Sequence, residues 1–239
     1  MGLRFETPDG HLQVDDTYKN LAVRHSGAIS SLTRQYTRTA YYDDIGGATL
    51  YISLFSITVT CDTPVIALTS GALARAVKSG TSWTFYIWIN TNSAGGGLSS
   101  SDRYFIFDKP QPISNPSGLI MRDVAGALCF HSEYKYLRVV ANDPFAGAGS
   151  DSNWVYTKSL STGSKILAHV PMTTQFWAAY SDRQTSGSIQ YEMTFQYAKA
   201  SSTTVRAAPL FLNAFDTDFP TGFAPTAHPK AMLIDVTNF

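Results

Sequence analysis

The sequence predicts an all-β protein with two tandem β-sandwich-like domains and few or no helices. Three features predict this fold: a strand-favouring composition, an internal repeat, and a proline-rich stretch between the two copies of the repeat. The chain of 239 residues is rich in Thr, Ser, Tyr, Phe and Val, and its only glutamates are Glu6, Glu133 and Glu192. Such a composition is typical of strands and turns, because β-branched and aromatic residues suit a pleated sheet and helix formers are scarce.

The repeat lies at the start of each half of the chain. Residues 2–23 recur without a gap at residues 118–139, 116 positions later. The identical pairs are Gly2/Gly118, Leu3/Leu119, Gly10/Gly126, Leu12/Leu128, Tyr18/Tyr134, Lys19/Lys135, Leu21/Leu137 and Val23/Val139. Composition alone would give about one or two identities in such a window. The chain is therefore expected to contain two copies of one β-rich unit.

Each copy is expected to begin with a β-hairpin. Apolar and polar residues alternate at 3–6 and 11–14, and the second copy keeps the apolar places. Between these arms lie Thr-Pro-Asp-Gly at 7–10 and Asp-Val-Ala-Gly at 123–126, which suit a type I turn with glycine at its exit. A third short strand is expected after Tyr18 and Tyr134. Two unrelated hairpins that converged on a favoured turn are the alternative.

The rest of the first unit reads as further strands. Residues 24–47 are polar and end in a loop signal, Asp-Asp-Ile-Gly-Gly. Strands are expected at 50–60, 64–68, 83–89 and 104–107, with a loop at 90–101. The stretch GALARAVK at 71–78 is the best candidate for a short helix.

Residues 109–117, KPQPISNPS, carry three prolines and predict the domain boundary. The expected domains are 1–112 and 113–239. In the second domain, strands are expected at 154–156 and 165–170, and a hairpin is expected from 176–180 and 189–197. Residues 210–215 are taken as the counterpart of 104–107, and 231–236 as an additional edge strand.

The charge balance argues against several classes of partner. The chain has 18 basic and 18 acidic residues, 15% charged residues and 44% hydrophobic residues. Nucleic acids and anionic membranes bind basic surfaces, so neither is an expected partner. A sparsely charged chain with 13% aromatic residues is expected to form a permanent homo-oligomer, a trimer or hexamer, that covers part of its surface. A larger than usual β core is the alternative explanation.

The sequence suggests synthesis in a cytoplasm without membrane insertion. Gly2 and Leu3 of the first hairpin follow Met1 directly, and no apolar run approaches the length of a membrane span. Cys61 and Cys129 occupy apolar, strand-like runs at positions that are not equivalent in the repeat, so two buried free thiols are expected.

No enzyme motif is present, and the sequence predicts no catalytic residue, no cofactor site and no metal site. The five histidines are scattered and are expected to be structural. A bound calcium at 143–151 or 216–218 remains an option, although solvated loops explain these aspartates better. A pair of carboxylates from separate strands, as in glycosidases, also stays open without positive support.

Aromatic residues outside the expected core are candidates for contact with a partner. The four tryptophans, Trp83, Trp88, Trp154 and Trp177, lie in strand-like runs and are expected in the core. Tyr36, Tyr41 and Tyr42 lie in the polar segment before Gly46 and are the candidate partner-contact residues. They suit a partner subunit as well as a ligand.

The repeated element resembles one found in small tail proteins of double-stranded DNA bacteriophages. In that family, Gly-Leu and an apolar strand precede a turn ending in Gly, a second apolar strand, and Tyr-x-x-Leu-x-Val; here these are residues 2–23 and 118–139. An aromatic strand ending in Asp often comes first, similar to Tyr104 to Asp108. The direct resemblance covers about a fifth of the chain, and only the ordered series is distinctive.

The resemblance implies a virion structural protein of a tailed bacteriophage, made in the host bacterial cytoplasm. It would scaffold the tail tip or baseplate or attach fibres, with contact to a host surface glycan or receptor as a further option. Its partners would be other virion tail proteins and copies of itself. A carbohydrate-binding, lectin-like module and a capsid decoration protein are the alternatives, and a glycan-cleaving enzyme ranks below both.

Overall fold

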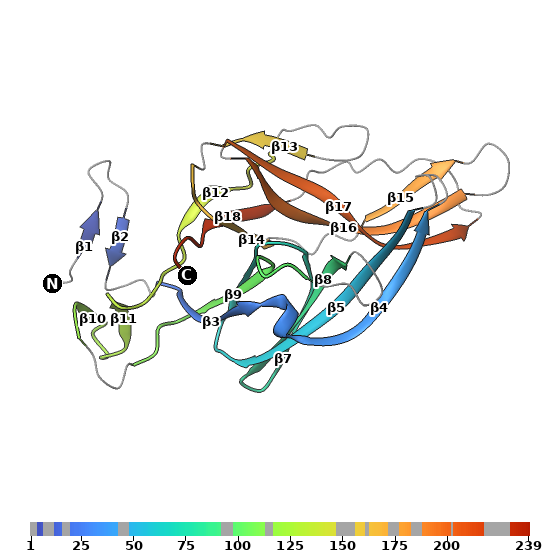
Figure 1. Cartoon of the computed structure of the whole chain (residues 1–239). Coiled ribbons are helices and arrows are strands. Elements are labelled where there is room, and N and C mark those ends of the chain that lie inside the picture. Colours follow the sequence, from blue (N-terminus) through green and yellow to red (C-terminus); the bar gives the residue numbers. More distant parts are fainter. Residues whose placement is uncertain are drawn as a thin grey trace.

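The computed structural model confirms the expected all-β class. It describes residues 4–6, 12–15, 20–42, 48–91, 98–112, 117–146, 156–160, 163–171, 177–182, 188–201, 203–217 and 230–239. These residues form strands and one 3-10 turn, Ile29–Ser31, with no α-helix among them. Within the same residues there is no helix of the length and apolarity that crossing a membrane requires. The molecule is elongated, and the hairpins β1–β2 and β10–β11 lie at one end (Figure 1).

The first half of the chain contains nine strands among the described residues. They are β1 (Arg4–Glu6), β2 (Leu12–Asp15), β3 (Ala22–Ala28), β4 (Thr33–Tyr42), β5 (Ala48–Thr60), β6 (Val65–Leu68), β7 (Ala72–Ser79), β8 (Ser82–Thr91) and β9 (Arg103–Asp108). The second half also contains nine described strands. They are β10 (Ile120–Arg122), β11 (Leu128–His131), β12 (Val139–Asn142), β13 (Tyr156–Ser159), β14 (Leu167–Pro171), β15 (Trp177–Asp182), β16 (Ser188–Ser201), β17 (Thr204–Thr217) and β18 (Ala231–Asp235).

The two copies of the repeat pair in the same register. In the first, Phe5 lies opposite Val14; in the second, Met121 lies opposite Phe130, 116 positions later in each strand. Both hairpins also shift register at the same step, after Phe5 and after Met121. A shared bulge is a specific feature, because it requires one extra residue at one place in the ladder. The repeat is therefore structural as well as sequential.

One antiparallel sheet of six strands runs through both halves of the chain. Its order is β12-β18-β14-β6-β9-β3, so the strand that follows each hairpin lies at an outer edge. The last strands, β9 and β18, lie next inward, and β6 and β14 meet in the middle. The two halves pair there through Leu68 and His169. This palindromic order relates the halves by an approximate two-fold axis between β6 and β14.

The outer sheets follow the same approximate two-fold relation between the halves. Their orders are β4-β5-β8-β7 in the first half and β13-β17-β16-β15 in the second. Strands β7 and β8 correspond to β16 and β17, because each pair is joined by a two-residue connection and is followed by a strand of the central sheet. Strand β5 then corresponds to β13. Each half adds one further strand, β4 beside β5 and β15 beside β16, at opposite edges of the shared pattern.

The two faces of the central sheet belong to different hydrophobic clusters. One face packs against the outer sheets, through Ile66, Leu68 and Ile106 in the first half and Leu167 and Leu233 in the second. The other face carries one cluster to which both halves contribute, formed by Ala67, Phe105, Phe107, Ala168, Val170, Ile234 and Val236. Alternation along the strands makes this division, since neighbouring residues point to opposite faces.

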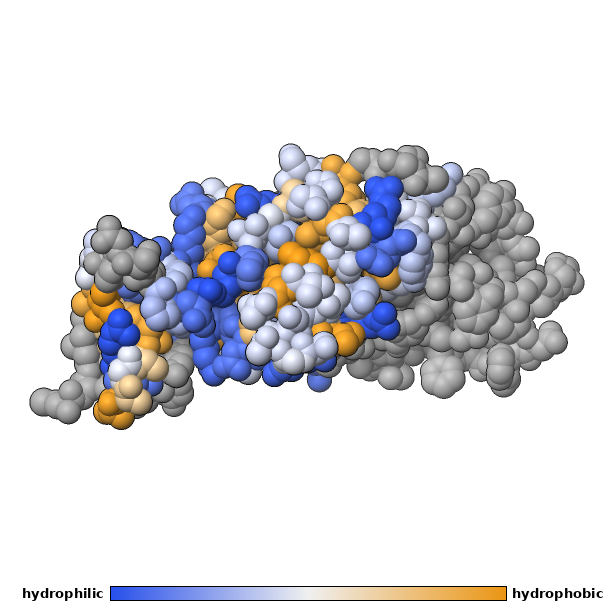
Figure 2. Space-filling model, turned by 90° about the horizontal axis from the view of Figure 1, so that it is seen from below, coloured by the Kyte–Doolittle hydropathy of each residue, from blue (hydrophilic) through white to orange (hydrophobic). Residues whose placement is uncertain are grey.

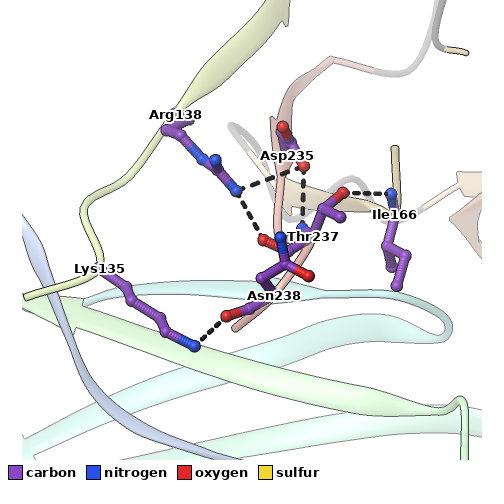
Figure 3. Close-up of polar contacts among 6 residues, drawn as sticks. All are labelled: Lys135, Arg138, Ile166, Asp235, Thr237 and Asn238. Carbon is purple, nitrogen blue, oxygen red and sulfur yellow. Dashed lines mark hydrogen bonds and ion pairs between the residues drawn. The ribbon is translucent and has the colours of Figure 1, made fainter. Parts of the chain in front are cut away.

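Residues 236–239 form a C-terminal strap that is held by side chains and backbone of the second half. The hydroxyl of Thr237 accepts a hydrogen bond from the Ile166 backbone (2.8 Å), and its carbonyl accepts one from Arg138 (2.8 Å). Lys135 donates to the Asn238 carbonyl, and Asp235 lies 3.5 Å from Arg138 (Figure 3). Burial raises the pKa of Asp235, but hydrogen bonds from Thr237 and the charge of Arg138 outweigh it and lower the pKa.

The strap ends on aromatic residues of the first half. The ring of Phe239 lies 6.0 Å from Phe105 and 6.0 Å from Phe107, both on β9. On the Phe239 ring lies the guanidinium of Arg138, 4.9 Å from the ring centroid. The strap therefore covers part of the shared cluster and joins β18 to β9 across the two-fold axis.

The structure corrects the expected helix at 71–78. Residues 72–79 form β7, an edge strand paired with β8. Leu73 packs against the sandwich core and Ala74 against the opposite cluster, so the residues alternate between faces as in a strand. Alanine, leucine, arginine and lysine favour helices in isolation, but pairing with β8 through the tight turn at Gly80 outweighs this preference.

The strand pairing also shows that 210–215 are not the counterpart of 104–107, contrary to the prediction from the sequence. Residues 210–215 belong to β17 of an outer sheet, whereas β18 occupies the place equivalent to β9. The expected edge strand at 231–236 is thus an internal strand, between β12 and β14. Strands at 50–60, 64–68, 83–89 and 104–107 are confirmed, with longer or slightly shifted bounds. The polar segment 24–47 contains β4, which the sequence did not predict.

The expected division into domains 1–112 and 113–239 stays a prediction. It falls between β9 and β10, and the two sandwich clusters are separate. The central sheet and the shared cluster nevertheless cross the division, so the halves share part of their core.

His169 is expected to make folding sensitive to acid. Its side chain is 1% exposed, and burial lowers its pKa to about 3, against a smaller opposing effect of the Leu68 backbone. The folded state therefore keeps the ring neutral, while the unfolded chain binds a proton below pH 6.5. Stability from this residue is complete above pH 6.5 and falls as pH decreases toward about 3, by about 1.4 kcal/mol per pH unit.

The measurement is urea unfolding of the wild type and of His169→Gln between pH 3 and pH 8. The variant removes the titrating group, so its stability should decrease less steeply with falling pH than that of the wild type. Carboxyl groups titrate in both proteins and cancel in the comparison. Parallel pH profiles would contradict the assignment.

Loss of the Phe239 ring should weaken the contact between the halves. Because the ring is half-buried, Phe239→Ala is expected to lower the free energy of unfolding by about 2 kcal/mol. Phe239→Leu keeps most of the apolar volume and should cost less than about 1.5 kcal/mol. Chemical denaturation measures both values, and an alanine variant as stable as the wild type would contradict the role of the strap.

Candidate functional site

The hairpin β10–β11 closes through a turn that its own residues specify. The Gly126 backbone donates to the Asp123 carbonyl (2.9 Å), which defines a four-residue turn. The Asp123 carboxyl accepts hydrogen bonds from the backbones of Ala125 (3.0 Å) and Ala127 (2.8 Å). Gly126 has φ +82°, the conformation that favours glycine. The expected turn at 123–126 is confirmed, whereas that at 7–10 lies outside the described residues.

A second glycine shapes the base of this hairpin. Gly118 has φ +88°, and a Cβ atom there would collide with the Oγ of Ser132. Ser132 and Leu119 exchange two hydrogen bonds, from the Leu119 backbone to the Ser132 hydroxyl (3.0 Å) and from the Ser132 backbone to the Leu119 carbonyl (2.9 Å). Only glycine lets the chain pass this close to Ser132 while these bonds form.

Aromatic side chains hold the hairpin to the segment that follows it. The rings of Phe130 and Tyr136 stack at 4.9 Å. The Tyr136 hydroxyl accepts from the His131 backbone (2.6 Å) and donates to the His131 carbonyl (3.1 Å). The His131 ring is buried and its Nδ1 accepts a bond from the Glu133 backbone (3.2 Å), so this histidine is structural. Burial raises the pKa of Tyr136, which remains a neutral hydrogen-bonding group.

The segment after the hairpin docks on the first half of the chain. The Tyr134 hydroxyl donates to the Gln111 carbonyl (2.6 Å) and accepts a longer bond from Arg24 (3.4 Å). Backbone bonds then join Leu137 to Leu21 (3.0 Å) and Val23 to Lys135 (2.8 Å). Because Leu21 and Leu137 are equivalent in the repeat, the two copies meet at the same residue. In the second copy, most of the identical positions therefore have structural roles.

Two identical positions of the second copy carry exposed apolar side chains, Leu119 beside the hairpin and Val139 at the start of β12, which is 53% exposed. The Leu119 side chain is 47% exposed, and Val124 at the hairpin tip is fully exposed. The first copy has Leu3 and Pro8 at the equivalent positions, which are also apolar. Figure 2 shows apolar residues on the surface at this end of the molecule. Leu119 lies at the base of the hairpin and Val124 at its tip; we refer to these two exposed side chains together as the hairpin patch, the candidate contact surface of the second hairpin.

Of the three candidate tyrosines, the structure describes the side chain of Tyr36 alone. Tyr36 lies on β4, is 41% exposed and contacts Trp88 edge to face, with centroids 5.6 Å apart. Tyr41 and Tyr42 lie at the end of the same strand, and their side chains are outside the described part. Tyr36 remains a candidate contact, on an outer sheet rather than at the hairpin end.

The residues considered for chemistry are mostly structural. Cys61 and Cys129 are buried free thiols, as expected. In the described part of the chain, no three or more His, Cys, Asp or Glu side chains are grouped to hold a metal ion. Much of 143–151 and the side chains of 216–218 lie outside that part, so the calcium option is not tested. Trp88 is buried and Trp83 half-buried, whereas Trp154 and the Trp177 side chain are not described.

Sequence reasoning missed the hairpin patch. It assigned Leu119 to the apolar face of the hairpin together with Met121, but Met121 is buried whereas Leu119 is exposed. The available signal was the position itself: an apolar residue that both copies keep at the hairpin start and at the turn. Comparison of the chain with protein-family models, curated proteins and solved structures returned no match.

The two glycines of the second hairpin should respond differently to alanine. Gly126→Ala meets no neighbour within 4 Å and carries only the cost of a positive φ, about 1 kcal/mol. Gly118→Ala adds the collision with Ser132 and is expected to cost more, about 2 to 4 kcal/mol. Chemical denaturation compares the variants, with Gly163→Ala as a control at another uncrowded glycine of positive φ. Equal costs at 118 and 126 would contradict the close approach.

Proposed function

We propose that the protein is a virion structural protein of a tailed bacteriophage, and that it acts by scaffolding at the tail tip, baseplate or fibre attachment. The observation that carries the proposal is the pair of hairpins with one register at one end of the molecule (Figure 1). Two equivalent projections suit attachment to a partner that offers the same site more than once, as symmetric assemblies do.

The residues that carry the family resemblance support the proposal as a structural unit. Gly118 and Gly126 shape the hairpin, and Tyr134 and Leu137 dock it on the body. Asp108, at the end of the aromatic strand, accepts backbone bonds from the loop before β6. The residues of the resemblance thus form a hairpin and the segment that holds it in a defined orientation on the rest of the molecule. A hairpin held in this way suits a scaffold, because a partner then meets it in that one orientation.

The composition supports the proposal independently. The chain is neutral and sparsely charged, so partners are selected by shape and apolar contact rather than by a broad electric field. The hairpin patch supplies such a contact at one end, and Tyr36 supplies another on β4. In this proposal the hairpins bind a neighbouring tail protein, and the outer sheets contact sister subunits in a trimer or hexamer.

The hairpin patch should be needed for incorporation into particles. The double variant Leu119→Asp, Val124→Asp places two charges on this patch and is expected to reduce incorporation at least about tenfold, because charge at an apolar contact is costly. The control is Ile166→Asp, which changes a 54% exposed residue outside both the hairpins and the outer sheets. Antibody labelling of purified particles, assembled in cells that express each variant in place of the wild type, measures the amount and the location.

Labelling at the tail in the wild type and in the control, with loss in the double variant, supports the proposal. Labelling over the capsid would instead identify a decoration protein. Light scattering on the purified chain tests the assembly separately: a trimer or hexamer is expected, and a stable monomer would contradict a permanent oligomer.

A further inference from the structure

A pocket with both polar and apolar lining lies at the end of the first sandwich, beside the docked segment of the second half. Its volume is about 630 Å³, within the range of small-molecule sites. Cys61 and Asp108 are buried in it, Arg24 is half-buried, and Thr60, Lys78 and Thr81 are exposed at its rim. Gln111 also lines it, and its carbonyl is held by Tyr134. All residues that line the pocket belong to the first half of the chain, and Tyr134 of the second half holds its rim at Gln111.

The acidic groups of the pocket are already engaged. The carboxyl of Asp108 accepts hydrogen bonds from the backbones of Asp62 (2.7 Å) and Thr63 (3.0 Å), one at each oxygen. Asp62 forms an ion pair with Lys109. Neither carboxyl group is therefore well placed to receive a further cation or donor from a ligand.

Cys61 lines the pocket with a thiol that is unreactive at neutral pH. Burial, together with the nearby charge and hydrogen bond of Asp108, raises the pKa of this thiol to about 11. At neutral pH the thiol is protonated, and thiols in that form are poor nucleophiles and poor metal ligands. The pocket is thus suited to binding rather than to covalent chemistry.

The basic groups retain donors for a ligand. Arg24 has five N–H donors, and in the described residues its guanidinium makes one long hydrogen bond, 3.4 Å to Tyr134. Lys78 is exposed, with its ammonium 5.4 Å from the centroid of the Trp83 ring. With Lys109 included, the site has three cations and two carboxylates, so it carries an excess of one positive charge.

We propose that this pocket binds an acidic sugar. One anionic group of the ligand would lie between Arg24 and Lys78, where charge-assisted hydrogen bonds are available. The hydroxyls of Thr60 and Thr81 and the amide of Gln111 would receive the ring hydroxyls, since each can both donate and accept. A single anion would occupy little of the pocket, whereas one or two sugar rings match its volume. This inference does not depend on a place in a virion.

The test is a titration of the full chain with sodium D-glucuronate and N-acetylneuraminate, followed by NMR shifts of backbone amides. Shifts are expected at 60–62, 78–81, 108, 109 and 111, with weak, saturable affinity. D-glucose, which lacks the acidic group, should bind at least about tenfold more weakly, because it loses the charge-assisted bonds. Inorganic phosphate should also bind more weakly than glucuronate, because it makes no ring contacts.

Two variants and one control distinguish binding at the pocket from an effect of the overall charge of the protein. Arg24→Gln and Lys78→Gln are each expected to weaken glucuronate binding about tenfold or more. Arg75→Gln removes a cation from the same strand as Lys78 but outside the pocket, where Arg75 lies over Tyr86, and should bind as the wild type does. Thermal unfolding of each variant checks that the fold is intact; Lys78 is exposed, so its variant remains informative if Arg24→Gln unfolds.

Absence of saturable shifts with both acidic sugars would overturn the proposal. Phosphate binding as tight as glucuronate would overturn the sugar assignment, since the pocket would then recognise an anion alone. Equal loss in Arg75→Gln and Lys78→Gln would overturn the site, because the effect would reflect overall charge.

Discussion

The arrangement depends on the pairing of β6 with β14. Each half of the chain builds three strands of a sheet and leaves one inner edge open, and open edges pair readily with other chains. Here each half satisfies the inner edge of the other. The backbone contact is short, at Leu68 and His169, so the joint also needs the shared cluster, the C-terminal strap and the bond between Leu21 and Leu137. The second copy thus completes the first.

This dependence explains which parts of the fold the sequence predicted. Hairpins and long strands follow from local alternation and turn residues, so the pairing at Met121 and Phe130 and the strand at 50–60 were accessible. Pairing between distant strands leaves little local signal. Residues 71–78 look helical in isolation and become a strand because β8 lies beside them. The place of β18 depends on its two neighbours from elsewhere in the chain, and no local pattern reveals it.

The candidate sites also differ in how much of each could be predicted from the sequence. The hairpin patch lies within the repeat, but the sequence predicted neither residue as a contact, because alternation and turn chemistry do not show which apolar side chains stay exposed. The pocket combines Arg24 from β3, Lys78 from β7 and Asp108 from β9, together with the rim held by Tyr134. These residues are far apart in sequence and follow no spacing rule, because a site assembled across strand ends depends on topology. Tyr36 was accessible from the sequence, since it stands in a polar segment that forms an outer strand.

The unmatched strands β4 and β15 give the molecule a direction. The duplicated strands alone would make the two flanks interchangeable, and a neighbour would meet the same surface from either side. Because β4 lies at the β5 edge in one half and β15 at the β16 edge in the other, the flanks differ. A contact between two unlike flanks would be head to tail and would close into a ring or continue as a filament, whereas a contact between two like flanks would form a two-fold dimer.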